Sequence, residues 1–527
     1  MLAKVHSFGI IGIDAYPFEI EVDVASGLPS ISIVGLPDSA IKESKERVRA
    51  SIKNSGFLYP PDRITVNLAP ADIKKEGSAF DLAIALGILA ACEQINIELL
   101  KDYYFVGELS LNGELRNTKG VLAMALAMKK RKIKKIIAPF VNANEAAIVK
   151  EVKVYGIKTL RELIGCLYNP EILQPMSADF SQRQVPPRTC ELDFCDVKGQ
   201  RAAKRALEVA ASGKHNILLI GPPGSGKTML AKRVTTILPD LTEDETLETT
   251  KIHSSMGFIE EGSGLISERP FRAPHHTISD IALVGGGSIP QPGEISLAHN
   301  GVLFMDELPE FHRNVLEVLR QPLEDGSIRV SRALKSLTFP ARFMLVAAMN
   351  PCPCGSFGQL KSSCRCTPNQ IYRYRSKISG PLLDRIDIHI EVPAIEYNEL
   401  SSNVPAESSA QIRERVDQAR LRQQERFSAE GARLPDGQGS ASGGRKDGIL
   451  SNAQMSHRQT RKYCTLGKEE NELLHAAMNN FHLSARAYDK ILKVSRTIAD
   501  LAGADLIKTE HLAEAIQYRS LDRDFFV

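Results

Sequence analysis

Apolar and polar residues alternate along several short segments in the first third of the chain. From Phe18 to Val24 every second residue is apolar and the residues between are acidic, which predicts a strand with one buried face. Further apolar runs predict strands at Ile31–Val34, Ile64–Leu68, Tyr104–Val106 and Ile136–Ala138. Apolar residues at helical spacing predict helices at 39–56, Phe80–Ala91 and Val121–Lys132. We therefore expect a first α/β domain at residues 1–170.

A second α/β pattern follows a proline-rich linker that we place at residues 171–190. Apolar runs at His215–Ile220, Gly301–Met305 and Phe343–Met349 each lead into polar residues, as strands of a parallel sheet do. These runs define an expected core at residues 191–395. A charged helix and a Gly/Ser-rich loop are expected at 396–450. The last region, 451–527, has helical spacing, with Ser484 and Thr509 as helix caps.

Composition narrows the class of protein. The chain has 527 residues, of which 43% are hydrophobic and 24% are charged, with a net charge of +3. No apolar run approaches the roughly 18 residues of a membrane span, and no secretory signal precedes the first strand, so we expect a cytoplasmic protein. Nine cysteines in a cytoplasmic chain argue against a disulfide scaffold.

A glycine-rich stretch separates the first strand of the expected core from a helix. It fits the phosphate-binding pattern G-x-x-x-x-G-K-[ST], and the residues expected to bind nucleotide are Gly221, Pro222, Pro223, Gly224, Ser225, Gly226, Lys227 and Thr228. In such a loop, backbone N–H groups face the phosphates, Lys227 reaches the β and γ oxygens, and Thr228 holds Mg²⁺. The alternative is an ordinary Gly-Pro turn.

Two carboxylates end the second core strand. Asp306 and Glu307 follow the apolar run Gly301–Met305, which resembles a Walker B motif. In that interpretation Asp306 helps to hold Mg²⁺, and Glu307 orients and deprotonates the attacking water. The alternative is an ordinary strand end.

Asn350 and Arg385 complete the expected catalytic set. Asn350 ends the third core strand and resembles sensor 1 of the AAA+ ATPases. The segment Ser379–Asp387 resembles the arginine-finger segment of the magnesium-chelatase and MCM branch, so Arg385 would act on the ATP of a neighbouring subunit. The alternative is a structural ion pair between Arg385 and Asp384 or Asp387.

Two insertions distinguish this core from a generic ATPase. We expect the glycine- and proline-rich stretch Phe271–Asn300 to form hairpins and loops rather than core. Within it, His275 and His276 have no third ligand at suitable spacing, which favours hydrogen bonding or contact with a strand over a metal. A second hairpin is expected at Ile328–Phe339, where Arg332 and Lys335 near the tip suit DNA phosphates; the alternative is a solvated hairpin tip.

Four cysteines cluster in a loop rich in Gly, Ser and Pro. They are Cys352, Cys354, Cys364 and Cys366. Four thiols so close together suit a tetrahedral Zn²⁺. The alternatives are reduced structural thiols and a redox switch.

The first domain resembles the proteolytic domain of Lon, which has a ribosomal S5 domain 2-like fold. The similar segments are Gly107–Gly113 and Ile136–Pro139. Alignment to the Lon nucleophile and lysine loops places Ala79 and Leu122 at the two catalytic positions. Because nucleophilic catalysis requires both groups, we expect the fold without peptidase activity.

The whole chain resembles the YifB/ComM family of magnesium-chelatase-like AAA+ proteins. The resemblance rests on four segments: Phe271–His276, Pro292–Phe304, Asn350–Gly355 and Ser379–Asp387. It implies a Lon-like domain, an AAA+ P-loop core and a helical lid, in which Arg486 would be the sensor 2 arginine and Arg496 is the competitor.

The family further implies a homohexameric motor driven by ATP and Mg²⁺. In the ComM branch this motor is a DNA helicase for branch migration in natural transformation, with single-stranded or branched DNA and recombination or competence proteins as partners. Two alternatives stay open. One is a metal-insertion motor that works with a separate metal-binding partner, and the other is a remodeller of proteins.

Overall fold

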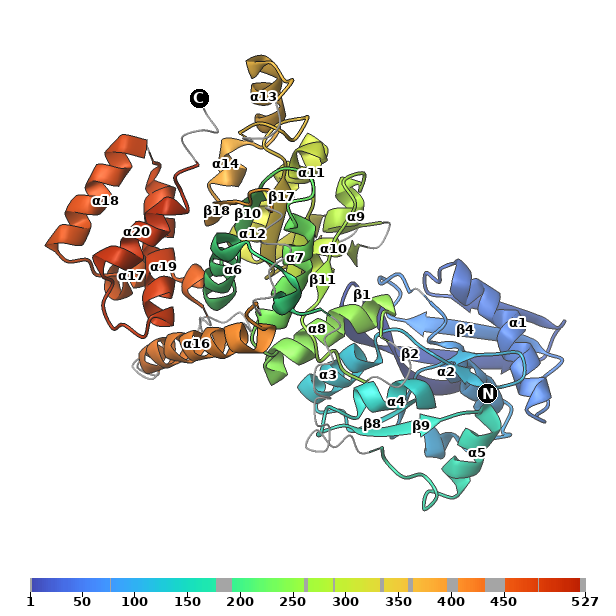
Figure 1. Ribbon diagram of the computed structural model, residues 1–527. Coiled ribbons are helices and arrows are strands. Elements are labelled where there is room, and N and C mark those ends of the chain that lie inside the picture. Colours follow the sequence, from blue (N-terminus) through green and yellow to red (C-terminus); the bar gives the residue numbers. More distant parts are fainter. Residues whose placement is uncertain are drawn as a thin grey trace.

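The computed structural model describes residues 2–75, 77–176, 192–259, 264–287, 290–331, 336–358, 364–395, 406–431, 451–481 and 483–521. Figure 1 shows an N-terminal α/β domain, a second α/β domain beside it, and a group of helices on the far side of the second domain. The observed fold confirms the expected mixed α/β class with a helical C-terminus. Among the described residues, no helix has the length and apolar character required to cross a bilayer.

The N-terminal domain is built on a sheet with the order β3-β4-β2-β1-β5-β8-β9. Its strands are β1 (Leu2–Ile11), β2 (Asp14–Ala25), β3 (Ser30–Val34), β4 (Arg63–Ala69), β5 (Tyr104–Phe105), β8 (Lys135–Pro139) and β9 (Lys153–Ile157). A short hairpin adds β6 (Glu108–Leu109) and β7 (Leu115–Arg116). Phe18, Ile20 and Val22 of β2 are buried, which confirms the strand predicted from alternation.

Helices cover this sheet. They are α1 (Ser39–Asn54), α2 (Asp81–Ala91), η1 (Ile97–Leu100), α3 (Val121–Arg131), α4 (Phe140–Ala146) and α5 (Leu160–Tyr168). Asp38 caps α1 by accepting a hydrogen bond from the N–H of Ile41. Every residue of α2 is buried, because this helix packs against β1 and β2 inside the domain.

The second domain has a parallel five-stranded sheet with the order β11-β14-β17-β10-β18. Its strands are β10 (Ile217–Ile220), β11 (Phe271–Arg272), β14 (Val302–Met305), β17 (Met344–Met349) and β18 (Ile388–Glu391). Each neighbouring pair of strands runs parallel. The carboxyl ends of all five strands therefore meet at one edge of the sheet.

Helices and two hairpins surround this sheet. The helices are η2 (Phe194–Asp196), α6 (Arg201–Gly213), α7 (Lys227–Ile237), α8 (Glu243–Met256), α9 (Asp280–Val284), α10 (Glu294–Leu297), η3 (Leu308–Glu310), α11 (Arg313–Val318), α12 (Arg320–Asp325), α13 (Pro368–Arg375) and α14 (Gly380–Leu383). The hairpins are β12 (Gly285–Gly286) with β13 (Gln291–Pro292), and β15 (Ser327–Ser331) with β16 (Ser336–Pro340). The second hairpin confirms the one predicted at 328–339.

The stretch from Phe271 to Asn300 departs from expectation. We expected hairpins and loops outside the core, and this is wrong in part. Phe271 belongs to β11, which pairs with β14 inside the main sheet, and its ring stacks on Phe304 at 6.0 Å between centroids. Leu283 and Ile295 are fully buried. Glycines and prolines mark turns in this segment, but the apolar residues between them still pack into the core.

The C-terminal helices pack on the second domain. They are α16 (Ser409–Gly431), η4 (Asn452–Gln454), α17 (His457–Tyr463), α18 (Lys468–Phe481), α19 (Ala485–Leu501) and α20 (Thr509–Gln517). Both α16 and α19 contact α6. Ser484 caps α19, as predicted. Thr509 is instead the first residue of α20, whose cap position is occupied by Lys508.

The two α/β domains meet through α3 and α8. The backbone N–H of Gly120 donates to the carbonyl of Ser254 at 2.9 Å, and the Ser254 hydroxyl donates to Glu145 at 3.0 Å. Lys251 also pairs with Asp14 at 2.5 Å. The N-terminal domain is thus attached to a helix of the second domain by polar contacts.

Candidate nucleotide site

The glycine-rich loop connects β10 to α7, as the sequence predicts. Gly224 and Gly226 have φ angles of 75° and 88°, a region that glycine occupies without steric cost. A Cβ atom on Gly221 would lie 2.1 Å from the carbonyl oxygen of Val392, so only glycine fits there. The loop sits at the carboxyl edge of the sheet, where parallel α/β folds bind their ligands.

The ammonium group of Lys227 lies inside this loop. Its Nζ donates to the carbonyls of Gly221 and Pro222 at 2.7 and 2.8 Å, and to Oδ1 of Asn350 at 3.2 Å. Burial lowers the pKa of Lys227, and the nearby Asp306 and Glu307 oppose that effect. The first residue of α7 and the asparagine that follows β17 therefore meet at the glycine-rich loop.

Thr228 and Asp306 form the oxygen pair expected for Mg²⁺. The Thr228 hydroxyl donates to Oδ2 of Asp306 at 2.7 Å. Hydroxyl and carboxylate oxygens are the ligands that Mg²⁺ takes beside nucleotide phosphates. The donor set therefore fits Mg²⁺.

Glu307 has a left-handed backbone with φ of 52°, and its side chain is 52% exposed. Its N–H donates to Oδ1 of Asp306 at 2.9 Å. The unusual backbone turns the two neighbouring carboxylates in different directions, which leaves Glu307 available to water.

His276 is a contact of this site that the sequence did not assign. Its Nδ1 lies 3.6 Å from Oε2 of Glu307, and its ring is 4.1 Å from that of His275. The sequence favours hydrogen bonding or contact with a strand over a metal for the two histidines, but it does not identify Glu307 as the neighbour. The available signal was their position directly after a strand that proves to pair with the Walker B strand.

Arg385 lies at the amino ends of the strands, whereas the glycine-rich loop lies at their carboxyl ends. It precedes β18, and its carbonyl accepts from the side chain of Asn216, which precedes β10. Arg385 is only 7% exposed, and its guanidinium pairs with Glu324 of α12 at 2.5 Å. The sequence-based alternative named Asp384 or Asp387 as partner, but Asp387 pairs with Lys490 at 2.5 Å instead.

Arg486 lies beside Arg385. Its Nη2 is 3.6 Å from the same Glu324 oxygen, and its side chain is 54% exposed. The competing residue, Arg496, is buried; it pairs with Asp500 at 2.9 Å and donates to the carbonyl of Asp505 at 2.7 Å. Arg496 therefore holds the lid together, and Arg486 is the arginine open to another molecule.

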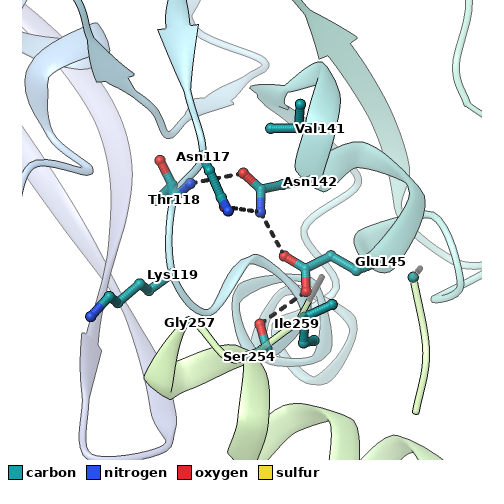
Figure 2. Close-up of a pocket in the computed structure, with 10 residues that line it drawn as sticks. Asn117, Thr118, Lys119, Val141, Asn142, Glu145, Ser254, Gly257 and Ile259 are labelled. Atoms are coloured by element: carbon teal, nitrogen blue, oxygen red, sulfur yellow. Dashed lines mark hydrogen bonds between the residues drawn. The ribbon is translucent and has the colours of Figure 1, made fainter. Parts of the chain in front are cut away.

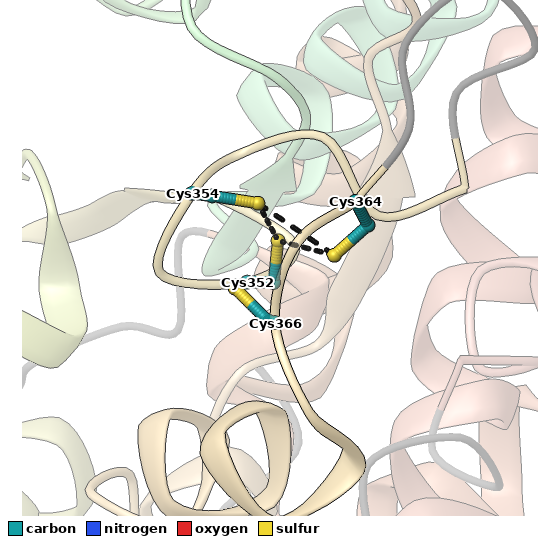
Figure 3. A group of neighbouring side chains, drawn as sticks. All are labelled: Cys352, Cys354, Cys364 and Cys366. Atoms are coloured by element: carbon teal, nitrogen blue, oxygen red, sulfur yellow. Dashed lines mark hydrogen bonds between the residues drawn. The ribbon is translucent and has the colours of Figure 1, made fainter.

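The cysteine cluster directly follows Asn350 in the chain. Figure 3 shows the side chains of Cys352, Cys354, Cys364 and Cys366 converging, and their sulfur atoms all lie within 4.8 Å of one another. Hydrogen bonds from the backbone N–H groups of Ser356 and Arg365 lower the pKa of the Cys354 thiol to about 5. These sulfurs are positioned to hold a metal ion.

Arg332 and Lys335, the predicted DNA contacts, lie outside the described residues. The strands on either side of them, β15 and β16, form a regular antiparallel ladder from Ser327–Pro340 to Ser331–Ser336. The role of the two basic residues stays a prediction.

The N-terminal domain has a polar pocket where it meets α8. Figure 2 shows Asn117, Asn142, Glu145 and Ser254 joined in a chain of hydrogen bonds. Glu145 is 4% exposed, and burial raises its pKa to about 7. Lys119 points away from this chain. The buried carboxyl group of Glu145 thus links the two domains through its hydrogen bond from Ser254.

Comparison with known proteins identifies the family. The magnesium chelatase, subunit ChlI, family matches residues 193–400, the subunit ChlI of Mg-chelatase family matches 20–142, and the ChlI C-terminal family matches 406–519. The competence protein ComM of Haemophilus influenzae is 46% identical over 530 residues, covering 99% of this chain and 98% of that protein.

Two further relatives extend the comparison. The uncharacterized protein YifB of Escherichia coli is 43% identical over 524 residues, covering 99% of this chain and 98% of that protein. Lon protease 2 of Bacillus subtilis is 29% identical over 184 residues, which are 32% of this chain and 31% of the protease. The chain belongs to the YifB/ComM family of magnesium-chelatase-like AAA+ ATPases.

Proposed function

We propose that this AAA+ ATPase works as a homohexamer in which each ATP is hydrolysed between two subunits, and that the ring moves DNA through its pore. The observation that carries the proposal is the separation of two arginines from the nucleotide loop of their own chain. Arg385 and Arg486 share Glu324 at the amino edge of the parallel sheet, whereas Lys227 lies at the carboxyl edge.

The length of the strands supports a role on a neighbouring subunit. Strands rise about 3.3 Å per residue, so the five steps from Asn216 to Gly221 put roughly 17 Å between the amino and carboxyl ends of the sheet. An arginine at one edge does not reach a phosphate at the other. Both arginines are then available only to a nucleotide on a neighbouring copy, as an arginine finger requires. Glu324 holds them together until the neighbour's phosphates compete for them.

The residues at the carboxyl ends of the strands bind the nucleotide and activate the attacking water. Lys227 and the loop N–H groups bind the phosphates, and Thr228 and Asp306 would hold Mg²⁺, which neutralises charge on the phosphate oxygens. Glu307 accepts a proton from the attacking water, and Asn350 orients that water or the γ-phosphate. His276 holds the Glu307 carboxylate in place. Arg385 of the next subunit stabilises the charge that develops on the transferred phosphoryl group.

DNA is the proposed substrate of the motor. Support comes from the hairpin β15–β16, which lies between the Walker B strand and the Asn350 strand, and from similarity to a protein named for competence. We assign Arg332 and Lys335 to contacts with DNA phosphates, which supply affinity without reading sequence. Branch migration during recombination or transformation is the reaction that we assign to the ring.

The cysteine cluster is assigned to Zn²⁺. Four thiolates in a closed set are typical of structural zinc sites. The ion would crosslink a loop whose exposed residues, such as Phe357 at 45% exposure, bury little apolar surface.

A metal-insertion motor is the second candidate, because three segments match magnesium chelatase subunit ChlI. One experiment separates the two. ATPase activity of the purified hexamer is measured alone and with single-stranded, forked and Holliday-junction DNA, and strand displacement is recorded. We expect stimulation by branched DNA and displacement that Lys227→Ala abolishes. A verified hexamer that hydrolyses ATP but responds to none of these DNAs would refute the helicase proposal and leave the second candidate.

A further inference from the structure

The cysteine loop contacts the nucleotide loop directly. Gly355, between the two cysteine pairs, packs so tightly against Pro223 that a Cβ atom there would lie 2.4 Å from the Pro223 Cδ and 2.7 Å from its Cγ. Pro223 is part of the phosphate-binding loop. The position of the cysteine loop therefore bears on the shape of the nucleotide site.

The same loop is continuous with the third catalytic strand. Asn350, which accepts a hydrogen bond from Lys227, is separated from Cys352 only by Pro351. The carbonyl of Pro351 accepts from Arg375 Nε at 3.2 Å, and the Arg375 guanidinium lies 5.3 Å from the centre of the Phe357 ring. The segment 350–358 thus connects Asn350, the first pair of cysteines and, through Gly355, Pro223.

The sulfur positions match one kind of ligand. The Sγ of Cys352 lies 3.4 Å from that of Cys354 and 3.7 Å from that of Cys364, and the last two are 3.6 Å apart. A tetrahedral Zn²⁺ with Zn–S bonds of about 2.3 Å places its sulfurs about 3.8 Å apart. A disulfide requires about 2.05 Å, and all four cysteines are free. Four thiolates leave no open position on the ion, so the site is structural rather than catalytic.

Packing alone gives this loop little support. Cys352 is fully buried, but Phe357 is 45% exposed and Cys354 is exposed as well. A short loop with so little buried apolar surface depends on a crosslink to keep one conformation. A crosslink among the cysteines would hold Gly355 against Pro223.

We propose that zinc bound by Cys352, Cys354, Cys364 and Cys366 presses the Gly355 turn onto Pro223 and thereby fixes the nucleotide loop and Asn350 in the geometry that binds ATP. The inference rests on the proposed ATPase site and on the assignment of zinc to the cluster. Its new content is that ATP affinity depends on zinc. Misplacement of binding groups by about 1 Å costs up to about 100-fold in function, so loss of zinc should weaken ATP binding by about 10- to 100-fold.

The first test uses the purified full-length protein and a fluorescent ATP analogue. Zinc content is measured by mass spectrometry, and the dissociation constant is measured before chelation, after chelation, and after return of Zn²⁺. We expect about one zinc per chain, weaker binding after chelation, and recovery with Zn²⁺ but not with Mg²⁺. Size-exclusion chromatography and circular dichroism at each stage show that the chain stays folded.

The second test keeps the cysteines and alters only the contact. Gly355→Ala places a methyl group against Pro223, and Gly358→Ala is its matched control. Both glycines have a φ of 80°, but a Cβ on Gly358 would meet nothing within 4 Å, so the two variants share backbone strain and differ in the contact. We expect Gly355→Ala to retain zinc and lose ATP affinity, and Gly358→Ala to retain both.

Each failure has a distinct meaning. Protein that contains no zinc as purified and still binds ATP normally overturns the metal site and the coupling but leaves the ATPase proposal intact. Zinc-loaded protein whose ATP affinity is unchanged by chelation, or by Gly355→Ala relative to Gly358→Ala, overturns the coupling alone. Zinc-loaded, folded protein that binds no ATP overturns the proposed function itself.

Discussion

In the ATPase core, two residues at the start of α7 meet two residues that follow strands: Lys227 bonds Asn350, and Thr228 bonds Asp306. In the N-terminal domain, by contrast, the two positions of a Lon-type dyad hold Ala79 and Leu122. Leu122 is fully buried among the apolar side chains of α3 and its neighbours. A cavity of about 330 Å³ remains beside Ala79, but the adjacent Ser78 hydroxyl is already bonded to Glu108. The core domain thus brings polar groups together at the carboxyl ends of its strands, whereas the N-terminal domain has apolar residues at both dyad positions and packs one of them, Leu122, into its core.

The difference teaches that a fold and its chemistry are separable within one chain. The N-terminal sheet is stabilised by the apolar side chains packed on its faces, and Leu122 is one of these side chains. The core sheet must also place Lys227, Asp306 and Asn350 within hydrogen-bond reach of one another or of their neighbours. We expect substitutions in the core to change catalysis and substitutions in the N-terminal domain to change stability.

Arg385→Ala should give the largest effect. Loss of an arginine finger lowers turnover by about 10³- to 10⁵-fold, with the ring intact. Mixing with Lys227→Ala subunits should restore activity, because a Lys227→Ala subunit offers its arginine to a neighbour with a working loop. Steady-state ATPase rates of single and mixed samples measure this.

Glu324→Gln is the matched control for Arg385→Ala. If Arg385 serves only its ion pair with Glu324, both variants should lose the same activity. If Arg385 acts on a neighbour's ATP, Glu324→Gln should retain most turnover, because removal of the competing carboxylate leaves the guanidinium in place. Equal losses, or normal hydrolysis by unmixed Arg385→Ala, would contradict the role in trans.

Glu307→Gln should lower turnover by about 10²- to 10⁴-fold while nucleotide binding is kept, because general base catalysis is worth about that much. Stopped-flow binding and steady-state hydrolysis separate the two steps. Glu310→Gln is the control, since Glu310 is nearby, pairs with Lys377 at 3.3 Å and has no place in the mechanism. An unchanged rate in Glu307→Gln would remove its assignment as base.

Much of the fold could be predicted because its signals are local. The alternation in β2 and the apolar runs of β4, β10 and β14 are visible in the sequence, and each became a strand. Strand β1, at the centre of the first sheet, was missed. Its apolar pattern is interrupted by Ser7, which is buried because its hydroxyl donates to the carbonyl of Phe105 at 2.7 Å. That partner is distant in sequence, so the pattern alone does not reveal why a polar residue is tolerated.

The residues of the candidate site also differ in whether local sequence signals could predict them. Asp306 and Asn350 each follow a strand of one parallel sheet, and Lys227 begins the helix after the glycine-rich loop of a third strand, so their meeting follows from local motifs and one topological rule. The pairing of Arg385 and Arg486 with Glu324 depends on how α12 and α19 pack, which no local pattern encodes. The contact between Gly355 and Pro223 is of the same kind. Long-range packing is therefore the part that required the structure.

Leu122→Lys tests the N-terminal half of the comparison. It restores the lysine of a Lon-type dyad, and with Ala79→Ser it restores both residue types. A lysine buried without a partner costs several kcal/mol, so we expect a strong loss of stability and no hydrolysis of casein. Leu111→Lys is the control, because Leu111 is 58% exposed. Peptidase activity in a stable double variant would show that the cleft had lost only its two catalytic groups.

Glu145→Gln should give the smallest effect, one that depends on pH. Burial raises the pKa of Glu145 from 4.5 to about 7 although the hydrogen bonds from Ser254 and Asn142 oppose that shift, so the folded protein favours the neutral carboxyl group. That contribution is fully present below about pH 4.5 and is lost as pH rises through about 7, amounting to at most about 3 kcal/mol. Glutamine is neutral throughout, so the unfolding temperature of the unmodified protein should fall relative to Glu145→Gln between pH 5.5 and 8.

Glu98→Gln provides the reference for that pH dependence, since Glu98 is 64% exposed and pairs with Lys101. Its unfolding temperature should follow that of the unmodified protein at every pH. Parallel curves for Glu145→Gln and the unmodified protein would mean that Glu145 is ionised in the folded state. The hydrogen bonds from Ser254 and Asn142 would then outweigh the effect of burial on the carboxyl group. The N-terminal domain would in that case contain a buried negative charge.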